Sequence, residues 1–164
     1  MSRPNRNSNP ESIVSTERTF FVTSSSANKR AIFQSERAAE LFCSTFLGYR
    51  DDGRFRVHAF VLMRDHFHAL ITVDESISIE KAVQFIKGGF AFRAGRELQM
   101  RDVWQRGFSE VRITDENLFL RARDYIHHNP VRAHMVALAQ DWDYSSANER
   151  WSMDPMPQGL KPPH

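Results

Sequence analysis

The chain has 164 residues, of which 41% are hydrophobic and 26% are charged, and this size fits one domain with a sizeable buried core. It contains no apolar run near the ~18 residues that a membrane span requires, and its first residues lack the apolar core of a signal peptide. We therefore expect a cytoplasmic protein. Its single cysteine, Cys43, excludes an internal disulfide and is expected to be a small buried hydrophobe.

Both ends of the chain differ in composition from the middle. Residues 1–17 are rich in Ser, Asn, Pro and Arg and show no periodicity, so they are expected to form a flexible N-terminal arm. Residues 151–164 contain four prolines without a repeating pattern and are expected to form a flexible C-terminal tail. The globular domain is therefore expected over residues 18–150.

The first half of this domain predicts a strand, a helix and a hairpin. Residues 19–23 are β-favouring and predict the first strand. From Ser35, a suitable N-cap, apolar residues recur at helical spacing until the turn at 51–53, which predicts a helix. Residues 54–63 and 66–73 are expected to form the two strands of an antiparallel hairpin.

The second half predicts two more helices around one strand. A helical pattern opens at Ser78 and contains Gly88-Gly89, which permits either tight helix packing, the favoured interpretation, or close approach of a phosphate backbone. Residues 103–113 predict a strand and residues 115–128 a long last helix, which should end at Asn129 because a following proline disfavours helical backbone. These elements predict an α+β fold, an antiparallel sheet with helices packed on one face.

Two histidines in the second hairpin strand predict a metal site. Alternation along a strand places His66 and His68 on the same face. Two imidazoles can share one divalent metal and leave other coordination positions open for water or a substrate phosphate. The chain has seven histidines, so an accidental pair of surface histidines is the alternative for this motif taken alone.

A tyrosine in the last predicted helix shares one stripe with an asparagine one turn later. Leu118, Ala122, Tyr125 and Asn129 follow one another at intervals of four, three and four residues, which places them along one stripe of the helix. Tyr125 is therefore expected to face inward. A core tyrosine whose hydroxyl is hydrogen bonded is the alternative.

Taken together, the segments MRDHFHALITV at 63–73 and ARDYIHHNPVRAHMV at 122–136 resemble a known family. They are similar to the single-tyrosine HUH nucleases, the transposases of the insertion-sequence 200 type, and most of all to the REP-associated tyrosine transposase branch. Four further stretches carry the likeness over roughly residues 18–148: RTFFVT at 18–23, FIKGGF at 85–90, VWQRGF at 103–108 and DYSSA at 143–147.

The resemblance implies a ferredoxin-like sheet and a DNA-cleaving site. Tyr125 would attack a backbone phosphorus of single-stranded DNA, leaving a free 3′-hydroxyl and a 5′-phosphotyrosine link. His66, His68 and Asn129 would bind Mg²⁺ or Mn²⁺, acting chiefly as a Lewis acid on the phosphate. The implied substrates are hairpin or palindromic repeat ends, and the implied protein is a nucleoid-associated monomer or homodimer that transposes DNA or processes repeated hairpin elements.

Net charge is only +2, but basic residues are concentrated in the second half of the chain. Residues 81–132 contain ten Lys and Arg against six Asp and Glu, and the planar arginine fork suits phosphate. We expect Lys87, Arg93, Arg106 and His128 to contact the DNA strand. Trp104 and Phe108 could stack on bases, but core packing is the favoured interpretation for both.

Two other functions fit parts of the pattern. A non-cleaving relative could recognise a DNA or RNA hairpin, although every expected site residue is present. A metal-dependent hydrolase of small phosphoesters could use His66 and His68 without a covalent tyrosine, but the sequence lacks the acidic ligands that such sites usually carry. Covalent capture of DNA distinguishes these alternatives from cleavage by Tyr125.

Overall fold

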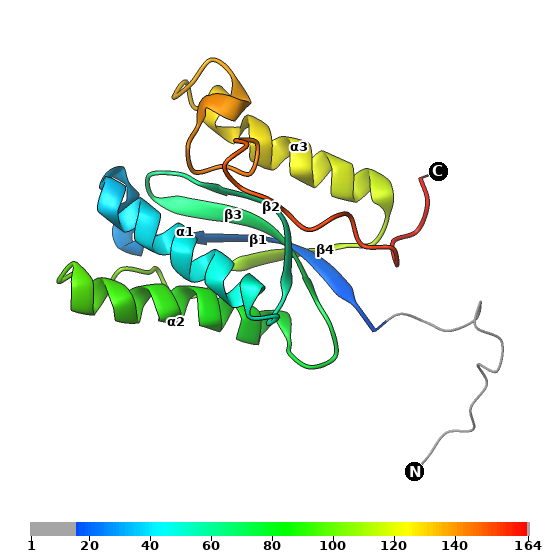
Figure 1. Ribbon diagram of the computed structural model, residues 1–164, viewed down its shortest axis with the longest axis horizontal. Coiled ribbons are helices and arrows are strands. Elements are labelled where there is room, and N and C mark those ends of the chain that lie inside the picture. Colours follow the sequence, from blue (N-terminus) through cyan, green and yellow to red (C-terminus); the bar gives the residue numbers. More distant parts are fainter. Residues whose placement is uncertain (1–15, 164) are drawn as a thin grey trace, which may run out of the picture.

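A computed structural model of the protein describes residues 16–163 and contains one four-stranded antiparallel sheet with strand order β2-β3-β1-β4 (Figure 1). The expected N-terminal arm falls mostly outside the described residues. The strands and longer helices, in chain order, are β1 (Arg18–Ser25), α1 (Glu36–Asp51), β2 (Arg56–Leu62), β3 (His66–Val73), α2 (Ile79–Glu97), β4 (Ser109–Ile113) and α3 (Glu116–Arg132). Three short 3₁₀ turns, Ala27–Lys29, Ile32–Gln34 and Ala139–Asp141, lie between or after them.

The sheet has helices on both faces. Strand and helix order from β1 to β4, with β1 and β3 central, is the ferredoxin-like arrangement, so the predicted α+β class and antiparallel sheet are confirmed. Helices α1 and α2 cover one face, as expected, but α3 is an addition that packs on the opposite face (Figure 1). Alternation along β3 explains why both faces are apolar: Phe67 and Ile71 join the core under α1 and α2, whereas Leu70 packs with Phe119 and Ile126 of α3.

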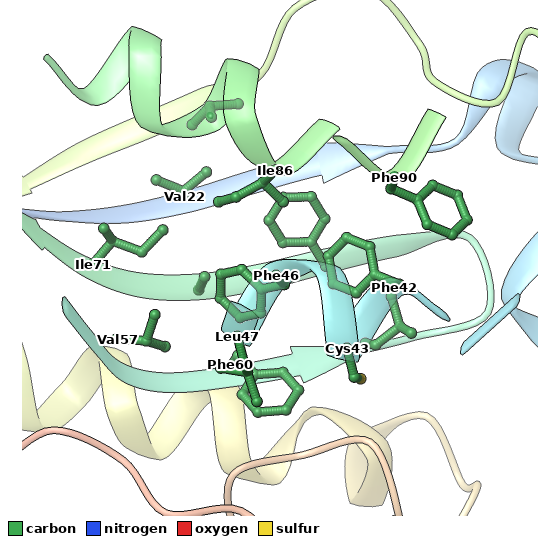
Figure 2. Packing of buried hydrophobic residues seen from close by; sticks show 14 of the residues in the cluster. Val22, Phe42, Cys43, Phe46, Leu47, Val57, Phe60, Ile71, Ile86 and Phe90 are labelled. Carbon is green, nitrogen blue, oxygen red and sulfur yellow. The ribbon is translucent and has the colours of Figure 1, made fainter. Parts of the chain in front are cut away.

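The main core lies between the sheet and helices α1 and α2 (Figure 2). Aromatic rings fill it, with Phe42 of α1 at 5.0 Å from Phe67 of β3 and 5.8 Å from Phe90 of α2 between ring centroids. Cys43 is fully buried there, and burial raises the pKa of its thiol, as expected for a small hydrophobe. An added Cβ at Gly89 would overlap the Tyr49 hydroxyl, which confirms that glycine there permits tight helix packing.

The expected strand at 103–113 is shorter in the structure. The continuous pairing with β1 covers only Ser109–Ile113. Before it, the Gln105 N–H donates to the Ser25 carbonyl at 2.9 Å, while Val103 and Trp104 turn toward the core. Val103 is buried, and the indole of Trp104 packs among the core rings and donates a hydrogen bond to the Lys87 carbonyl at 2.9 Å. Gly107 has a φ of +83°, which breaks the extended backbone just before β4 begins.

Helix α3 passes through Pro130 and ends at Arg132, so the prediction that it ends at Asn129 is wrong. Proline lacks one backbone donor, and in the last helical turn only one hydrogen bond is lost. The backbone N–H groups of Ala133 and Met135 donate to the carbonyls of Asn129 and Pro130 at 3.0 and 2.9 Å, which closes the helix end. Pro130 is buried.

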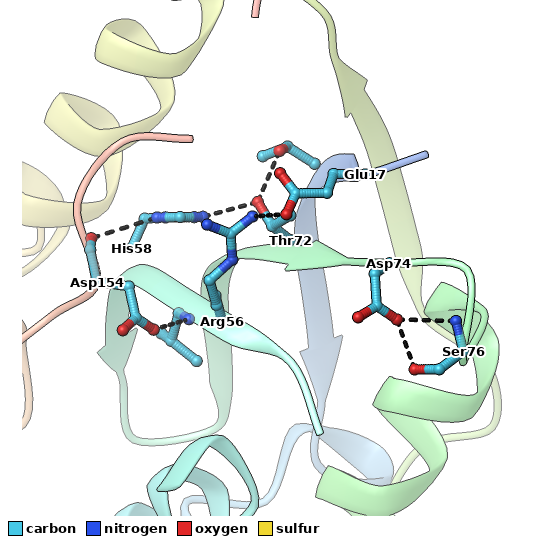
Figure 3. A network of polar contacts seen from close by, with 9 residues as sticks. Glu17, Arg56, His58, Thr72, Asp74, Ser76 and Asp154 are labelled. Carbon is cyan, nitrogen blue, oxygen red and sulfur yellow. Dashed lines mark hydrogen bonds and ion pairs between the residues drawn. The ribbon is translucent and has the colours of Figure 1, made fainter. Parts of the chain in front are cut away.

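The C-terminal segment, expected to be a flexible tail, instead makes ordered contacts along the sheet. The Asp154 N–H donates to the Val57 carbonyl at 2.9 Å, and the Asp154 carboxylate accepts from the Val57 N–H at 2.8 Å, beside a buried histidine on β2 (Figure 3). Further on, the Lys161 carbonyl accepts from the first N–H of α3, that of Glu116, at 2.9 Å. These contacts pair the segment with residues far away in sequence, which composition alone does not indicate.

None of the helices in residues 16–163 is both long enough and apolar enough to span a membrane.

Candidate active site

His66 and His68 lie at the start of β3, on the sheet face that α3 covers. Their ring centroids are 4.9 Å apart and the rings are nearly perpendicular. His68 is 6% exposed, whereas the His66 side chain is 23% exposed. The strand alternation therefore places the two imidazoles together, as predicted, with one of them open to solvent.

Hydrogen bonds orient both imidazoles. Nδ1 of His66 lies 2.7 Å from Oδ1 of Asp65, and because a carboxylate accepts, Nδ1 carries the hydrogen and Nε2 keeps its lone pair. Nδ1 of His68 lies 2.7 Å from the hydroxyl of Thr23 on β1. If Nδ1 donates to this hydroxyl, Nε2 of His68 is likewise the atom left to bind a metal.

The electrostatic surroundings keep His68 neutral. Burial, with smaller contributions from His66 and Arg132, lowers the pKa of His68 to about 3. Neutral imidazole is the form that coordinates metals. Our reading of the sequence missed both orienting residues: Asp65 precedes His66 directly, whereas Thr23 is found only through the strand register, in which it is paired with His68.

Tyr125 of α3 lies over the same sheet face. Its ring centroid is 5.4 Å from that of His68 and 5.8 Å from that of Phe21 on β1. The ring is nevertheless 45% exposed, so the expectation that Tyr125 faces inward is only partly right, and it is not a core tyrosine. Val111 of β4, paired with Phe21, is 55% exposed, so the sheet beside Tyr125 is open on the side away from β2.

Asn129 follows Tyr125 by one turn of α3 and is half-buried. This position is on the flank of the helix that faces the sheet, and its role as a metal ligand stays a prediction. Within residues 16–163 no three His, Cys, Asp or Glu side chains form a group that could hold a metal. Two neutral imidazoles and an amide oxygen nevertheless fit a hard divalent cation that takes its remaining oxygens from water and substrate phosphate.

The residues expected to grip DNA lie in different places. Lys87 and Arg93 belong to α2, on the sheet face opposite Tyr125. The Lys87 ammonium donates to the carbonyls of Gln105 and Gly107 at 3.0 and 2.7 Å, and burial lowers its pKa. Arg93 donates to side chains of α1 and to Glu97. Both therefore support the fold on the far side, and a contact with the strand stays a prediction.

Four other predicted residues differ in exposure. Arg106 lies exposed in the loop before β4, and His128 lies exposed on α3 with Nδ1 3.0 Å from the Asp124 carbonyl. Trp104 and Phe108 are half-buried and pack against the main core, as the favoured interpretation of the sequence predicted.

His127 and Arg132 have roles that the sequence did not indicate. Nε2 of His127 lies 2.8 Å from the Ser146 hydroxyl, so this histidine connects α3 to the segment after it. The Arg132 guanidinium lies over the ring of Tyr125, 4.2 Å from its centroid, and donates to the Tyr125 carbonyl at 2.9 Å. Arg132 follows Tyr125 by seven residues, which places both on the same side of the helix. This spacing could have indicated their contact from the sequence.

Two oriented imidazoles thus lie on a ferredoxin-like sheet, with an exposed tyrosine packed against one of them, which is the arrangement expected of a HUH-type protein. Residues 19–129 match the family model described as Transposase IS200 like, and the chain belongs to this family. The resemblance recognised in the sequence is therefore confirmed, and membership implies a DNA-processing enzyme.

Individual relatives agree with the family assignment. The chain is 25% identical over 129 residues to the REP-associated tyrosine transposase of Escherichia coli K12, covering 78% of this chain and 75% of that protein. It is 29% identical over 105 residues to a Haemophilus influenzae protein named provisionally as a REP-associated tyrosine transposase. That match covers 56% of this chain and 58% of the relative, so the chain spans little more than half of that protein's length.

One solved structure has a similar fold along nearly the whole chain. It is a REP-associated tyrosine transposase bound to a REP hairpin, with a TM-score of 0.69, 21% sequence identity and coverage of 98% of this chain and 94% of that one.

Proposed function

We propose that the protein cleaves and rejoins single-stranded DNA, with Tyr125 as the nucleophile. One observation carries the proposal: the exposed Tyr125 ring packs 5.4 Å from His68, beside the only pair of oriented imidazoles on this face of the described structure. A nucleophile next to candidate metal ligands on an open sheet surface is the arrangement that phosphoryl transfer to a tyrosine requires.

In the proposed reaction the Tyr125 oxygen attacks a backbone phosphorus of DNA. The bond between Tyr125 Oη and phosphorus forms as the bond from phosphorus to the 3′-oxygen breaks. The phenolic proton is lost to solvent and the 3′-oxygen gains one, so the products are a 3′-hydroxyl and a 5′-phosphotyrosine. Attack by another 3′-hydroxyl reverses these changes and rejoins DNA, and the exchange of one phosphodiester for another requires no nucleotide cofactor.

The histidine pair and Asn129 would hold Mg²⁺ or Mn²⁺, which when bound supplies Lewis-acid polarisation of a phosphate oxygen. The protein's own part is to orient both imidazoles through Asp65 and Thr23, and to keep His68 neutral by burying it. Because the three protein ligands are uncharged, substrate phosphate should contribute to metal binding.

The proposed substrates are single strands with hairpin or palindromic repeat ends, in DNA transposition or in the processing of repeated elements. The hairpin-bound structure of similar fold and the REP-associated relatives support this substrate class. We place the protein in the cytoplasm at the nucleoid, as a monomer or homodimer.

The test is covalent capture. Incubation with Mg²⁺ and a single-stranded hairpin oligonucleotide from the surroundings of the gene should give a protein–DNA adduct that survives denaturation, together with a fragment bearing a 3′-hydroxyl. Tyr125→Phe should abolish the adduct and retain DNA binding, because the ring keeps its contacts with His68 and Phe21. Tyr144→Phe, in the segment after α3, is the matched control and should form the adduct at the wild-type rate.

Two outcomes would contradict the proposal. An adduct formed by Tyr125→Phe would mean that another residue is the nucleophile. Tight binding of the hairpin by the wild-type protein without any adduct would favour the second candidate, a hairpin-binding protein that does not cleave.

A further inference from the structure

Arg132 is the charged side chain in contact with the proposed nucleophile. Its guanidinium carbon lies 4.2 Å from the centroid of the Tyr125 ring, and its Nη2 donates to the Tyr125 carbonyl at 2.9 Å. A guanidinium has five N–H donors in a planar fork, so this single hydrogen bond leaves most of them available. Within residues 16–163 no carboxylate forms an ion pair with Arg132.

The position of Arg132 combines exposure with proximity to the site. The residue is exposed at the end of α3, yet its side chain lies back over Tyr125 instead of extending into solvent. It is also close enough to His68 for its charge to act on that imidazole. Its positive charge therefore lies beside the proposed nucleophile, and within the described residues no carboxylate forms an ion pair with it.

A stripe of exposed residues on α3 continues this surface. Arg121, Tyr125, His128 and Arg132 are separated by four, three and four residues, and all four are exposed. They therefore lie along one side of the helix, and Tyr125 within this stripe contacts Phe21 of β1. Arg123, by contrast, is half-buried on another side of the helix, close enough to His127 for its charge to act there.

We propose that Arg132 binds the phosphate that Tyr125 attacks, and this inference rests on the proposed cleavage reaction. The planar fork of arginine matches two phosphate oxygens at once. A donor placed where charge develops during phosphoryl transfer stabilises the transition state more than the ground state. Contact with the Tyr125 ring would place the bound phosphorus beside the phenolic oxygen.

The main experiment compares Arg132→Gln, Arg132→Lys and the matched control Arg123→Gln. Arg132→Gln should slow formation of the adduct by roughly 100-fold, in the range seen when one transition-state donor is removed. Arg132→Lys should form the adduct at a rate between those of wild type and Arg132→Gln, because lysine keeps the charge but lacks the planar fork of arginine. Arg123→Gln should react within about twofold of wild type, since neutralising a charge away from the site should change the rate little.

A binding experiment separates phosphate contact from a role in the fold. In a Tyr125→Phe background without metal, the logarithm of affinity for the hairpin oligonucleotide falls with the logarithm of salt concentration. Adding Arg132→Gln should reduce this slope by about 0.7, the value for one phosphate contact on a single strand. Adding Arg123→Gln should leave the slope unchanged.

The outcomes distinguish a failure of the proposed cleavage reaction from a failure of the role assigned to Arg132. If the wild-type protein forms no adduct, the cleavage reaction is overturned, and the role of Arg132 in it as well. If wild type forms the adduct and Arg132→Gln forms it as fast as Arg123→Gln, only the assignment of Arg132 is overturned. A slow Arg132→Gln variant with an unchanged salt slope also overturns the phosphate contact, because the arginine would then act only on the position of Tyr125.

Discussion

The carboxylate of Asp65 lies 2.7 Å from Nδ1 of His66, so the imidazole that is more open to solvent is held with Nε2 as the atom available to a metal. His68 has a corresponding contact with Thr23. Each of the two histidines therefore has its own orienting partner, one from the adjacent turn and one from the neighbouring strand. Orienting partners of this kind matter for metal affinity nearly as much as the ligands do.

Asp65→Ala should weaken metal binding. Without the carboxylate, His66 loses the hydrogen bond that selects its tautomer and holds its ring, and loss of such a contact typically lowers metal affinity ~10- to 100-fold. The Mg²⁺ or Mn²⁺ concentration for half-maximal adduct formation should rise accordingly. Asp74→Ala, at the exposed far end of β3 where the carboxylate bonds only to Ser76 in its own turn, is the control. Equal metal titrations for both variants would contradict the role given to Asp65.

Asn129→Ala tests the third proposed ligand. The metal concentration needed for half-maximal cleavage should rise while DNA binding without metal stays near that of wild type, because the amide is expected to contact the metal. Asn129→Asp should be tolerated, since a carboxylate is a good ligand for a hard cation. Asn117→Ala, an exposed asparagine in the first turn of α3, is the control. An unchanged metal titration would leave Asn129 as a residue of the helix end alone.

His58 should make stability depend on pH. Its ring is buried, with Nδ1 3.3 Å from the Asp154 carbonyl and Nε2 2.7 Å from the Thr72 hydroxyl, which in turn lies 2.7 Å from that of Thr19 (Figure 3). Burial lowers the pKa of His58, as does the charge of Arg56, and the hydrogen bond and charge of Asp154 oppose this effect only in part.

The sign of the effect follows from the lowered pKa. Below about pH 6.5, the usual histidine pKa, the unfolded chain binds a proton that the folded protein does not, so the free energy of unfolding should decrease as the pH falls. His58→Gln cannot titrate and should show a smaller loss of stability between about pH 7 and pH 5 in urea denaturation. The buried His68 and half-buried His127 also have lowered pKa values and should keep part of the slope. Parallel pH profiles for the two proteins would contradict the prediction.

Gly88 and Gly89 should respond oppositely to alanine. An added Cβ at Gly88 meets nothing within 4 Å, whereas one at Gly89 would overlap the ring and hydroxyl of Tyr49. Gly88→Ala should raise the free energy of unfolding by up to ~1 kcal/mol through helix propensity. Gly89→Ala should lower it by roughly 1 kcal/mol or more, because overpacking outweighs that gain. Thermal or urea unfolding measures both, and combining Gly89→Ala with Tyr49→Ala should remove the penalty of the added methyl group. Stabilisation by Gly89→Ala would show that α2 can shift freely against Tyr49.

Local sequence patterns were enough to predict several parts of the site. Strand alternation placed His66 and His68 on one face, and helical spacing placed Tyr125 and Asn129 on one flank of a helix. These predictions succeed because backbone periodicity is a local property that depends on neighbouring residues. The helix end at Asn129 was predicted wrongly, because proline disfavours helical structure locally, whereas the burial of Pro130 and the hydrogen bonds of the last helical turn decided the outcome.

By itself, then, the sequence determined the elements, the pairing of the two histidines on a strand and the family to which the chain belongs. Only the tertiary structure decided that α3 packs on the sheet face opposite α1 and α2, which brings Tyr125 to His68 and leaves Lys87 and Arg93 on the far side. It also decided that Thr23 orients His68 and that Arg132 lies over Tyr125. Strand register and the burial of apolar faces depend on residues far apart in the chain, and no local period contains that information.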